Sequence, residues 1–156
     1  MDAFRSAIED AVRGCKDALF DAANEAQLLT PLEIAEALYV SAIEHGVTDA
    51  HYNLGLLYLG QGRVSEADAS FVRAAEAGDS KGAFMHAQEL EEGGHMLEAE
   101  RFYTMAVDLP ETAIRLARVL RATGRPEQAR DLIARSAPTN PEAAVEWVVE
   151  YKPPLE

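Results

Sequence analysis

The feature that most constrains this chain is a set of small and aromatic residues that recurs about every thirty residues. An alanine column has separations of 32, 32 and 30 residues, and a column of large side chains lies four residues after it. The two columns are Ala35, Ala67, Ala99 and Ala129, and Tyr39, Phe71, Tyr103 and Ile133. Small residues at fixed places indicate helices that cross closely, with large side chains filling the gaps beside them. The spacing therefore predicts one structural unit repeated four times.

Each unit reads as two amphipathic helices joined by a tight turn. Apolar residues recur at three- and four-residue spacing on both sides of a turn position, which is occupied by glycine in three of the four units. The turn column is Thr30, Gly62, Gly94 and Gly124, and the small-residue column of the first helices is Ala23, Gly55, Ala87 and Ala117. A glycine at the turn can adopt positive φ, which ends one helix and allows the next to begin. The pattern predicts an all-α protein.

These units organise the chain as one helical-repeat domain over residues 1–152. The segments are an N-terminal helix at 1–16, repeats at 17–46, 48–78, 81–107 and 111–137, a C-terminal capping helix at 140–151, and a tail at 153–156. Gly14 leaves open whether residues 2–28 form one helix or two. Asn140 followed by Pro141 is a helix start. Trp147 in the last helix either covers the final repeat or reaches into the groove or a neighbouring chain.

The second unit resembles the tetratricopeptide repeat, and its ending also looks like the related Sel-one-like repeat. The residues that carry the tetratricopeptide signature are Leu54, Gly55, Tyr58, Gly62, Ala67, Phe71 and Ala74. The first unit has Ala22 and Ala26 in place of the leucine and tyrosine, the third has His86 for the leucine, and the fourth lacks the aromatics. The resemblance implies a right-handed α-α superhelix of about four repeats with capping helices. It also implies a concave groove lined by the first helix of each pair.

Family positions for groove lining carry over to fixed offsets from the small-residue column. They are Asp21, Asn24 and Gln27; Tyr52, Asn53, Leu56 and Leu59; Phe84, Met85, Gln88 and Glu91; and Arg115, Arg118 and Arg121. The candidate peptide-binding residues among them are Tyr52, Asn53, Leu56, Phe84, Gln88, Arg115, Arg118 and Arg121. The resemblance implies that an asparagine at position 53 holds a peptide backbone or carboxylate. The alternative is a solvated or locally bonded amide.

Charge is distributed unevenly along these positions. Residues 17–62 contain seven acidic residues and no lysine or arginine, whereas residues 111–135 contain six arginines against three acidic residues. Arg115, Arg118 and Arg121 step by three and share one broad helix face. We therefore expect a partner with an acidic or C-terminal carboxylate group at the arginine end and basic groups at the acidic end. The alternative is that these arginines pair with acidic residues of the chain itself: Glu91, Glu92 or Glu111.

Composition excludes several classes of function. The net charge of −13 disfavours a nucleic-acid partner and an anionic membrane surface. No apolar run approaches the roughly 20 residues that span a bilayer, and the start of the chain lacks the pattern of a secretory signal. A single cysteine, Cys15, excludes an intrachain disulfide or a cysteine metal cluster, and it falls on an apolar seam. We expect a cytoplasmic location, no metal and no cofactor.

Catalytic motifs are also lacking. The four histidines form no His-Glu-x-x-His pair and have no motif-linked nucleophile. The sequence thus predicts a noncatalytic protein- or peptide-binding scaffold. Two alternatives stay open: a small acidic chaperone or assembly subunit for a secreted or complexed partner, and a self-associating homo-oligomer such as a homodimer.

Overall fold

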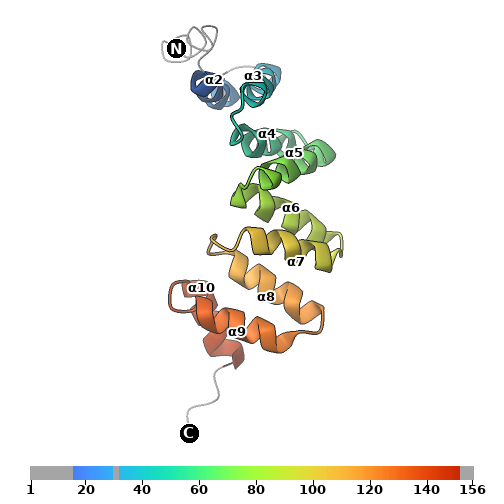
Figure 1. The fold of residues 1–156 in the computed structure, drawn as a ribbon, viewed down its shortest axis with the longest axis vertical. Coiled ribbons are helices and arrows are strands. Elements are labelled where there is room, and N and C mark those ends of the chain that lie inside the picture. The colour runs from blue at the N-terminus through green and yellow to red at the C-terminus, as the bar shows by residue number, and fades with distance from the viewer. Residues whose placement is uncertain (1–15, 30–31, 152–156) are drawn as a thin grey trace. The chain divides into compact units, whose positions relative to one another are not determined.

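The computed structural model describes residues 16–29 and 32–151, and among these residues the regular structure is entirely helical (Figure 1). The elements are α2 (Lys16–Leu29), α3 (Leu32–Glu44), α4 (Ala50–Gly60), α5 (Val64–Glu76), α6 (Ser80–Glu92), α7 (Met96–Met105), α8 (Thr112–Ala122), α9 (Pro126–Ser136), α10 (Pro141–Glu146) and the π-helix η1 (Trp147–Tyr151). Residues 1–15 of the predicted helix at 1–16, with Gly14 and Cys15 among them, lie outside the described residues, as do Thr30 and the tail. The all-α helical-repeat fold is confirmed.

The turn glycines end helices in the way the repeat predicts. Gly62 and Gly124 have φ of 73° and 78°, and Gly94 has φ of 80°. The residue after each glycine donates its backbone N–H to a carbonyl five residues earlier, as Arg63 does to Tyr58 at 3.0 Å. This bond satisfies a carbonyl that the helix end would otherwise leave without a partner. The glycines therefore both stop the first helix of a pair and reverse the chain.

The chain divides into two compact units, residues 1–82 and 83–156, with the boundary inside α6. Unit 1 packs α2 against α3, α3 against α4, and α4 against α5. Unit 2 packs α7 against α8, α8 against α9, and α9 against α10 and η1. Each unit has its own apolar core. A single domain over residues 1–152 stays a prediction.

The residues of the alanine column and of the column of large side chains are buried inside the two units. Tyr39 and Phe71 are fully buried in unit 1, and Tyr103 and Ile133 are fully buried in unit 2. The alanine column is buried at all four positions. At Gly55 a Cβ atom would lie 2.5 Å from Cε1 of Phe71, so only glycine allows this approach. The close crossing inferred from small residues is therefore present.

The C-terminal element begins as predicted and ends differently. The Asn140 side chain accepts hydrogen bonds from the backbone N–H groups of Glu142 and Ala143, at 3.0 and 3.2 Å, with Pro141 at the first helical position. After Glu146 the helix changes from α to π, and the π turn runs from Trp147 to Tyr151. A hydrogen-bonding change of this kind inside a helix is rare and re-aims the side chains that follow it.

Candidate binding faces of the two units

In unit 1, a hydrogen-bonded set of polar side chains joins α2, α3 and α4. The Tyr39 hydroxyl donates to Oδ1 of Asn24 at 2.6 Å, and the Asn53 amide donates to the same oxygen at 2.8 Å. The Gln27 amide in turn donates to the Tyr39 hydroxyl. The two asparagines come from neighbouring first helices, so α2 and α4 present one continuous face here. We call this set the amide cluster: Asn24, Gln27, Tyr39 and Asn53.

The amide cluster fixes the orientation of Asn53. Burial raises the pKa of Tyr39 to about 12, and a hydrogen bond from Asn53 opposes the rise, so the hydroxyl stays protonated and can donate. Asn53 uses its nitrogen toward Asn24. Its side-chain carbonyl oxygen has no partner among the described residues. This half-buried amide is therefore held in place and still has an acceptor to offer.

Apolar side chains flank the amide cluster on α4. Leu56 is 38% exposed on the same helix as Asn53. The half-buried Tyr52 ring packs at 6.0 Å from the Phe71 ring, with the Lys81 ammonium 5.7 Å from its centroid. Tyr52, Asn53 and Leu56, which the sequence marks as candidates, thus lie within one turn of α4.

In unit 2, the corresponding polar position is a buried carboxylate. Glu91 has a side chain only 8% exposed, and it accepts a hydrogen bond from the Tyr103 hydroxyl at 2.6 Å. Arg115 and Arg118 approach it at 3.3 and 3.4 Å, with side-chain exposures of 31% and 59%. Burial raises the pKa of Tyr103, and the bond to Glu91 raises it further. Two of the three candidate arginines therefore neutralise an acid of the chain itself, as the alternative for this face predicted.

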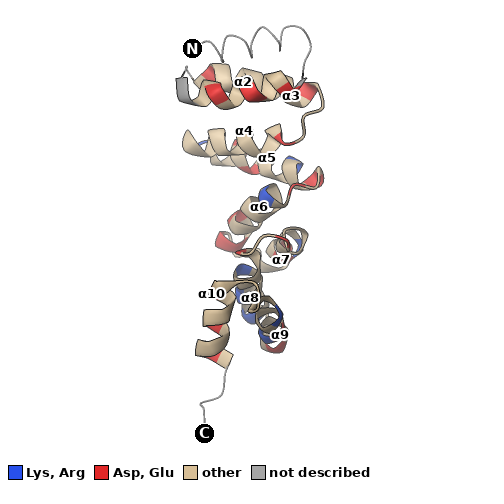
Figure 2. Ribbon diagram, turned by 90° about the vertical axis from the view of Figure 1, so that its left-hand side faces the viewer, with Lys and Arg blue, Asp and Glu red and all other residues tan. Residues whose placement is uncertain are grey.

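The third arginine is held by the C-terminal segment. The Arg121 guanidinium donates to Glu146 at 2.6 Å, to the Tyr151 hydroxyl at 2.8 Å, and to Glu150. Its side chain is 29% exposed. The three arginines thus share a helix and have different partners. Figure 2 shows the basic positions on α8 and α9 and the acidic ones on α2 and α3. A groove that joins these two charges stays a prediction.

Two further candidates of unit 2 lie on α6. The Phe84 ring is half-buried and meets the Tyr103 ring edge-on, with centroids 5.7 Å apart. This contact places Phe84 against the core. Gln88 is half-buried. Sequence reasoning placed Phe84 in the groove lining, and the structure shows that its ring also serves the core.

One pattern was missed at the sequence level. Four residues after the small-residue column stands a column of Gln27, Leu59, Glu91 and Arg121. Gln27 and Glu91 contact the hydroxyl of Tyr39 and Tyr103, and leucine occurs in the repeat that has Phe71 and hence no hydroxyl. In three units the signal was present in the sequence, because a polar residue accompanies tyrosine and leucine accompanies phenylalanine. The fourth unit departs from it, because Arg121 accompanies Ile133.

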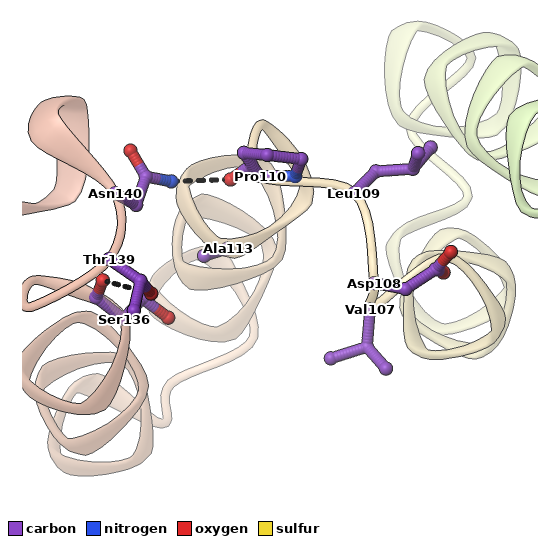
Figure 3. A pocket seen from close by; sticks show the side chains of 8 residues that line it. All are labelled: Val107, Asp108, Leu109, Pro110, Ala113, Ser136, Thr139 and Asn140. Atoms are coloured by element: carbon purple, nitrogen blue, oxygen red, sulfur yellow. Dashed lines mark hydrogen bonds between the residues drawn. The ribbon is translucent and has the colours of Figure 1, made fainter.

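Each unit also has a small pocket away from these polar clusters. The pocket of unit 1 has a volume of about 350 Å³ and lies among α3, α4 and α5; Val40, Ile43, Leu54 and Tyr58 line it. The pocket of unit 2 has a volume of about 290 Å³ and lies between the α7–α8 and α9–α10 connections (Figure 3). There the Asn140 amide donates to the Pro110 carbonyl, which ties the two connections together. Polar side chains also line the pocket of unit 1, among them Glu44, His51 and Ser70.

The described part of the chain holds no group of three or more histidine, cysteine, aspartate or glutamate residues placed to bind a metal ion. None of the helices within 16–29 and 32–151 combines the length and the apolar character that crossing a membrane requires.

The comparisons with known proteins bear on these repeats directly. Sequence profiles described as tetratricopeptide repeat match residues 48–77 and 110–135. These matches support the tetratricopeptide-like repeat family that the recurring residues indicated. The matched ranges fall on α4–α5 and α8–α9, the second and fourth units of the repeat. A search of curated proteins found no match.

Solved structures share the fold. A Sel1 repeat protein from Oxalobacter formigenes superposes with a TM-score of 0.73 at 21% identity, over 84% of this chain and 62% of that one. This chain thus spans about three-fifths of that protein. YrrB, a tetratricopeptide repeat protein, superposes with a TM-score of 0.69 at 23% identity, over 93% of this chain and 82% of that one. MamA superposes with a TM-score of 0.60 at 16% identity, over 88% of this chain and 80% of that one. At these identities the likeness is one of fold.

Proposed function

We propose that this chain is a noncatalytic scaffold that binds an extended segment of a partner protein across α2 and α4 of unit 1. Tetratricopeptide repeats support a role in protein interaction. The observation that carries the finer proposal is the amide cluster, which orients the Asn53 side chain and leaves its carbonyl oxygen without a partner. Preorganised polar groups bind without a further ordering cost, which favours affinity.

An extended segment suits this face for a chemical reason. Its backbone N–H groups have no internal partners, so each needs an acceptor when the segment leaves water. Asn53 supplies one through its carbonyl oxygen. Leu56, 38% exposed, and the half-buried Tyr52 supply apolar area beside it. A few fixed polar groups within an apolar surface are typical of ligand-binding sites.

The charge of unit 1 favours basic residues in the partner. Asp17, Asp21 and Glu25 follow one another at four-residue spacing along α2, and the first two are exposed. Residues at this spacing lie on one face of a helix. Lysine or arginine side chains of a bound segment would therefore be attracted to α2, chiefly raising the association rate and the selectivity. YrrB is described as having an unusual peptide-binding site, which supports a peptide as the type of ligand.

The test is a binding measurement with peptides selected from a random library on the full chain. Asn53→Ala should weaken the selected peptides about 3- to 10-fold, the effect of losing one net hydrogen bond of about 0.5–1.5 kcal/mol. Glu76→Ala, an exposed position of α5, is the matched control and should leave affinity unchanged. Helicity and melting temperature of both variants are compared with the wild type. Equal affinities in all three proteins would contradict the proposal.

A further inference from the structure

Arg121 is hydrogen-bonded to three side chains of the C-terminal segment. Its planar guanidinium donates to two carboxylates and one hydroxyl, those of Glu146, Glu150 and Tyr151. A guanidinium has five N–H donors in a rigid fork, which suits several oxygen acceptors at once. The two carboxylates are four residues apart, the spacing of one helical turn. Arg121 therefore binds two acidic side chains that lie one turn apart in a helical segment.

The segment that supplies this pattern is held most firmly at its N-terminal end. Asn140 caps α10 and donates to the Pro110 carbonyl, and Ala143 is fully buried. Beyond Glu146 the helix becomes a π turn, in which the main-chain hydrogen bonds shift by one residue. Three valines of the segment face solvent: Val145, Val148 and Val149 are 64%, 56% and 76% exposed. This end is thus fixed mainly by polar contacts to Arg121 and by Trp147 and Tyr151 at the edge of the core.

We propose that Arg121 is a recognition site for acidic helical segments, and that residues 146–151 of the chain occupy it in place of a partner. The partner segment carries two carboxylates one turn apart followed by an aromatic hydroxyl, the chemistry the site already holds. The tethered segment competes at a millimolar effective concentration, so only a partner that matches the pattern well displaces it. The site lies in unit 2, apart from Asn53. This inference rests on the proposed function in one respect, that the partner is a segment of a protein.

The site differs from the neighbouring arginines in what it can accept. Arg115 and Arg118 face the buried Glu91, which no partner can displace without opening the core. Of the two carboxylates on Arg121, Glu146 is 14% exposed and Glu150 is 49% exposed, so the bond to Glu150 is the one that can exchange with another carboxylate in place. Arg121 is therefore the arginine of α8 at which binding of a carboxylate can be tested without unfolding unit 2.

The test uses the chain's own segment as a peptide. The probe has the sequence of residues 140–151 with phenylalanine in place of Trp147, which leaves the single tryptophan of the protein as the reporter. The protein variant Glu146→Gln/Glu150→Gln weakens the tethered segment. It should bind the acidic probe at least 10-fold more tightly than the wild type does, with a red shift of Trp147 emission. Adding Arg121→Gln to this variant should abolish the binding.

A second probe with glutamine at positions 146 and 150 is the control and should bind none of the proteins. Equal affinity of wild type and double variant, or equal binding of both probes, would overturn the inference. If the double variant loses helicity, Glu150→Gln alone gives the same comparison with a milder change. Because the probe comes from this chain, its binding to Arg121 does not depend on the Asn53 face. The probe experiment can therefore fail while the Asn53 experiment succeeds, and the reverse.

Discussion

The hydrogen bond between Tyr103 and Glu91 provides a quantitative test of how unit 2 is held together. Both side chains are buried, and their oxygens are 2.6 Å apart. A hydrogen bond to a charged group contributes about 1.5–3 kcal/mol, whereas a neutral one contributes about 0.5–1.5 kcal/mol. Tyr103→Phe should therefore lower the free energy of unfolding by about 2 kcal/mol. The ring itself fits, because phenylalanine stands in the same column at position 71.

The matched control is Tyr39→Phe, the same change at the equivalent position of unit 1. Tyr39 donates to the neutral Asn24, so the expected loss is about 1 kcal/mol. Urea unfolding followed by far-UV circular dichroism measures both variants. Trp147 fluorescence reports on unit 2 separately, because its ring packs against that core.

A double-mutant cycle isolates the pair. Glu91→Gln removes the charge while keeping the shape, and the coupling between Tyr103→Phe and Glu91→Gln should be at least about 1 kcal/mol. The exposed neighbour Glu92 gives the control change Glu92→Gln, which should leave stability within about 0.5 kcal/mol of the wild type. A coupling below about 0.5 kcal/mol, or a larger loss for Tyr39→Phe than for Tyr103→Phe, would refute the reasoning.

Three further predictions concern unit 1. Gly55→Ala should lower the free energy of unfolding by about 1–2 kcal/mol, because the new Cβ would displace the buried Phe71 ring. Gly60→Ala on the same helix is the control: a Cβ there meets open space, so the free energy of unfolding should rise by about 0.5–1 kcal/mol in the same urea assay. The hydrogen bond from Arg63 holds the pKa of Glu36 below its usual range. The stability that ionised Glu36 contributes is therefore fully present above about pH 4.3 and is lost as the pH falls through the lowered pKa. Glu36→Gln should accordingly show a shallower loss of stability in acid than the wild type; parallel curves would contradict this. Burial lowers the pKa of His51, with Arg73 adding to the effect, so folded unit 1 binds fewer protons there and loses stability as pH falls below about 6.5; melting temperatures of His51→Gln should lack this slope.

The sequence predicted the fold because its signals are local and repeated. Each turn glycine, each alanine of the column and each large side chain four residues later acts within one helix pair, so spacing alone places it. Asn140 and Pro141 were likewise readable, since a cap needs only the residues that follow it.

The polar contacts were less accessible, because they depend on residues about 25–30 positions apart whose helices must first be packed. Arg121 reaches Glu146 and Glu150 of the last element, and the π turn that brings Tyr151 to it has no simple sequence signature. The charge count indicated that an arginine face exists. The sequence named Glu91 as one of three acidic residues that could pair with this face. That Glu91 is the one chosen, and that it is buried, follows only from the packed helices.

The central claim is that a partner segment lies across α2 and α4 with its backbone against Asn53. The most direct measurement is a crystal structure of the full chain with a peptide selected from the random library. We predict a backbone N–H of the peptide within 3.2 Å of the Asn53 carbonyl oxygen, with apolar side chains on Leu56 and Tyr52. A peptide seated in the pocket among α3, α4 and α5, with Asn53 left in solvent, would contradict the account.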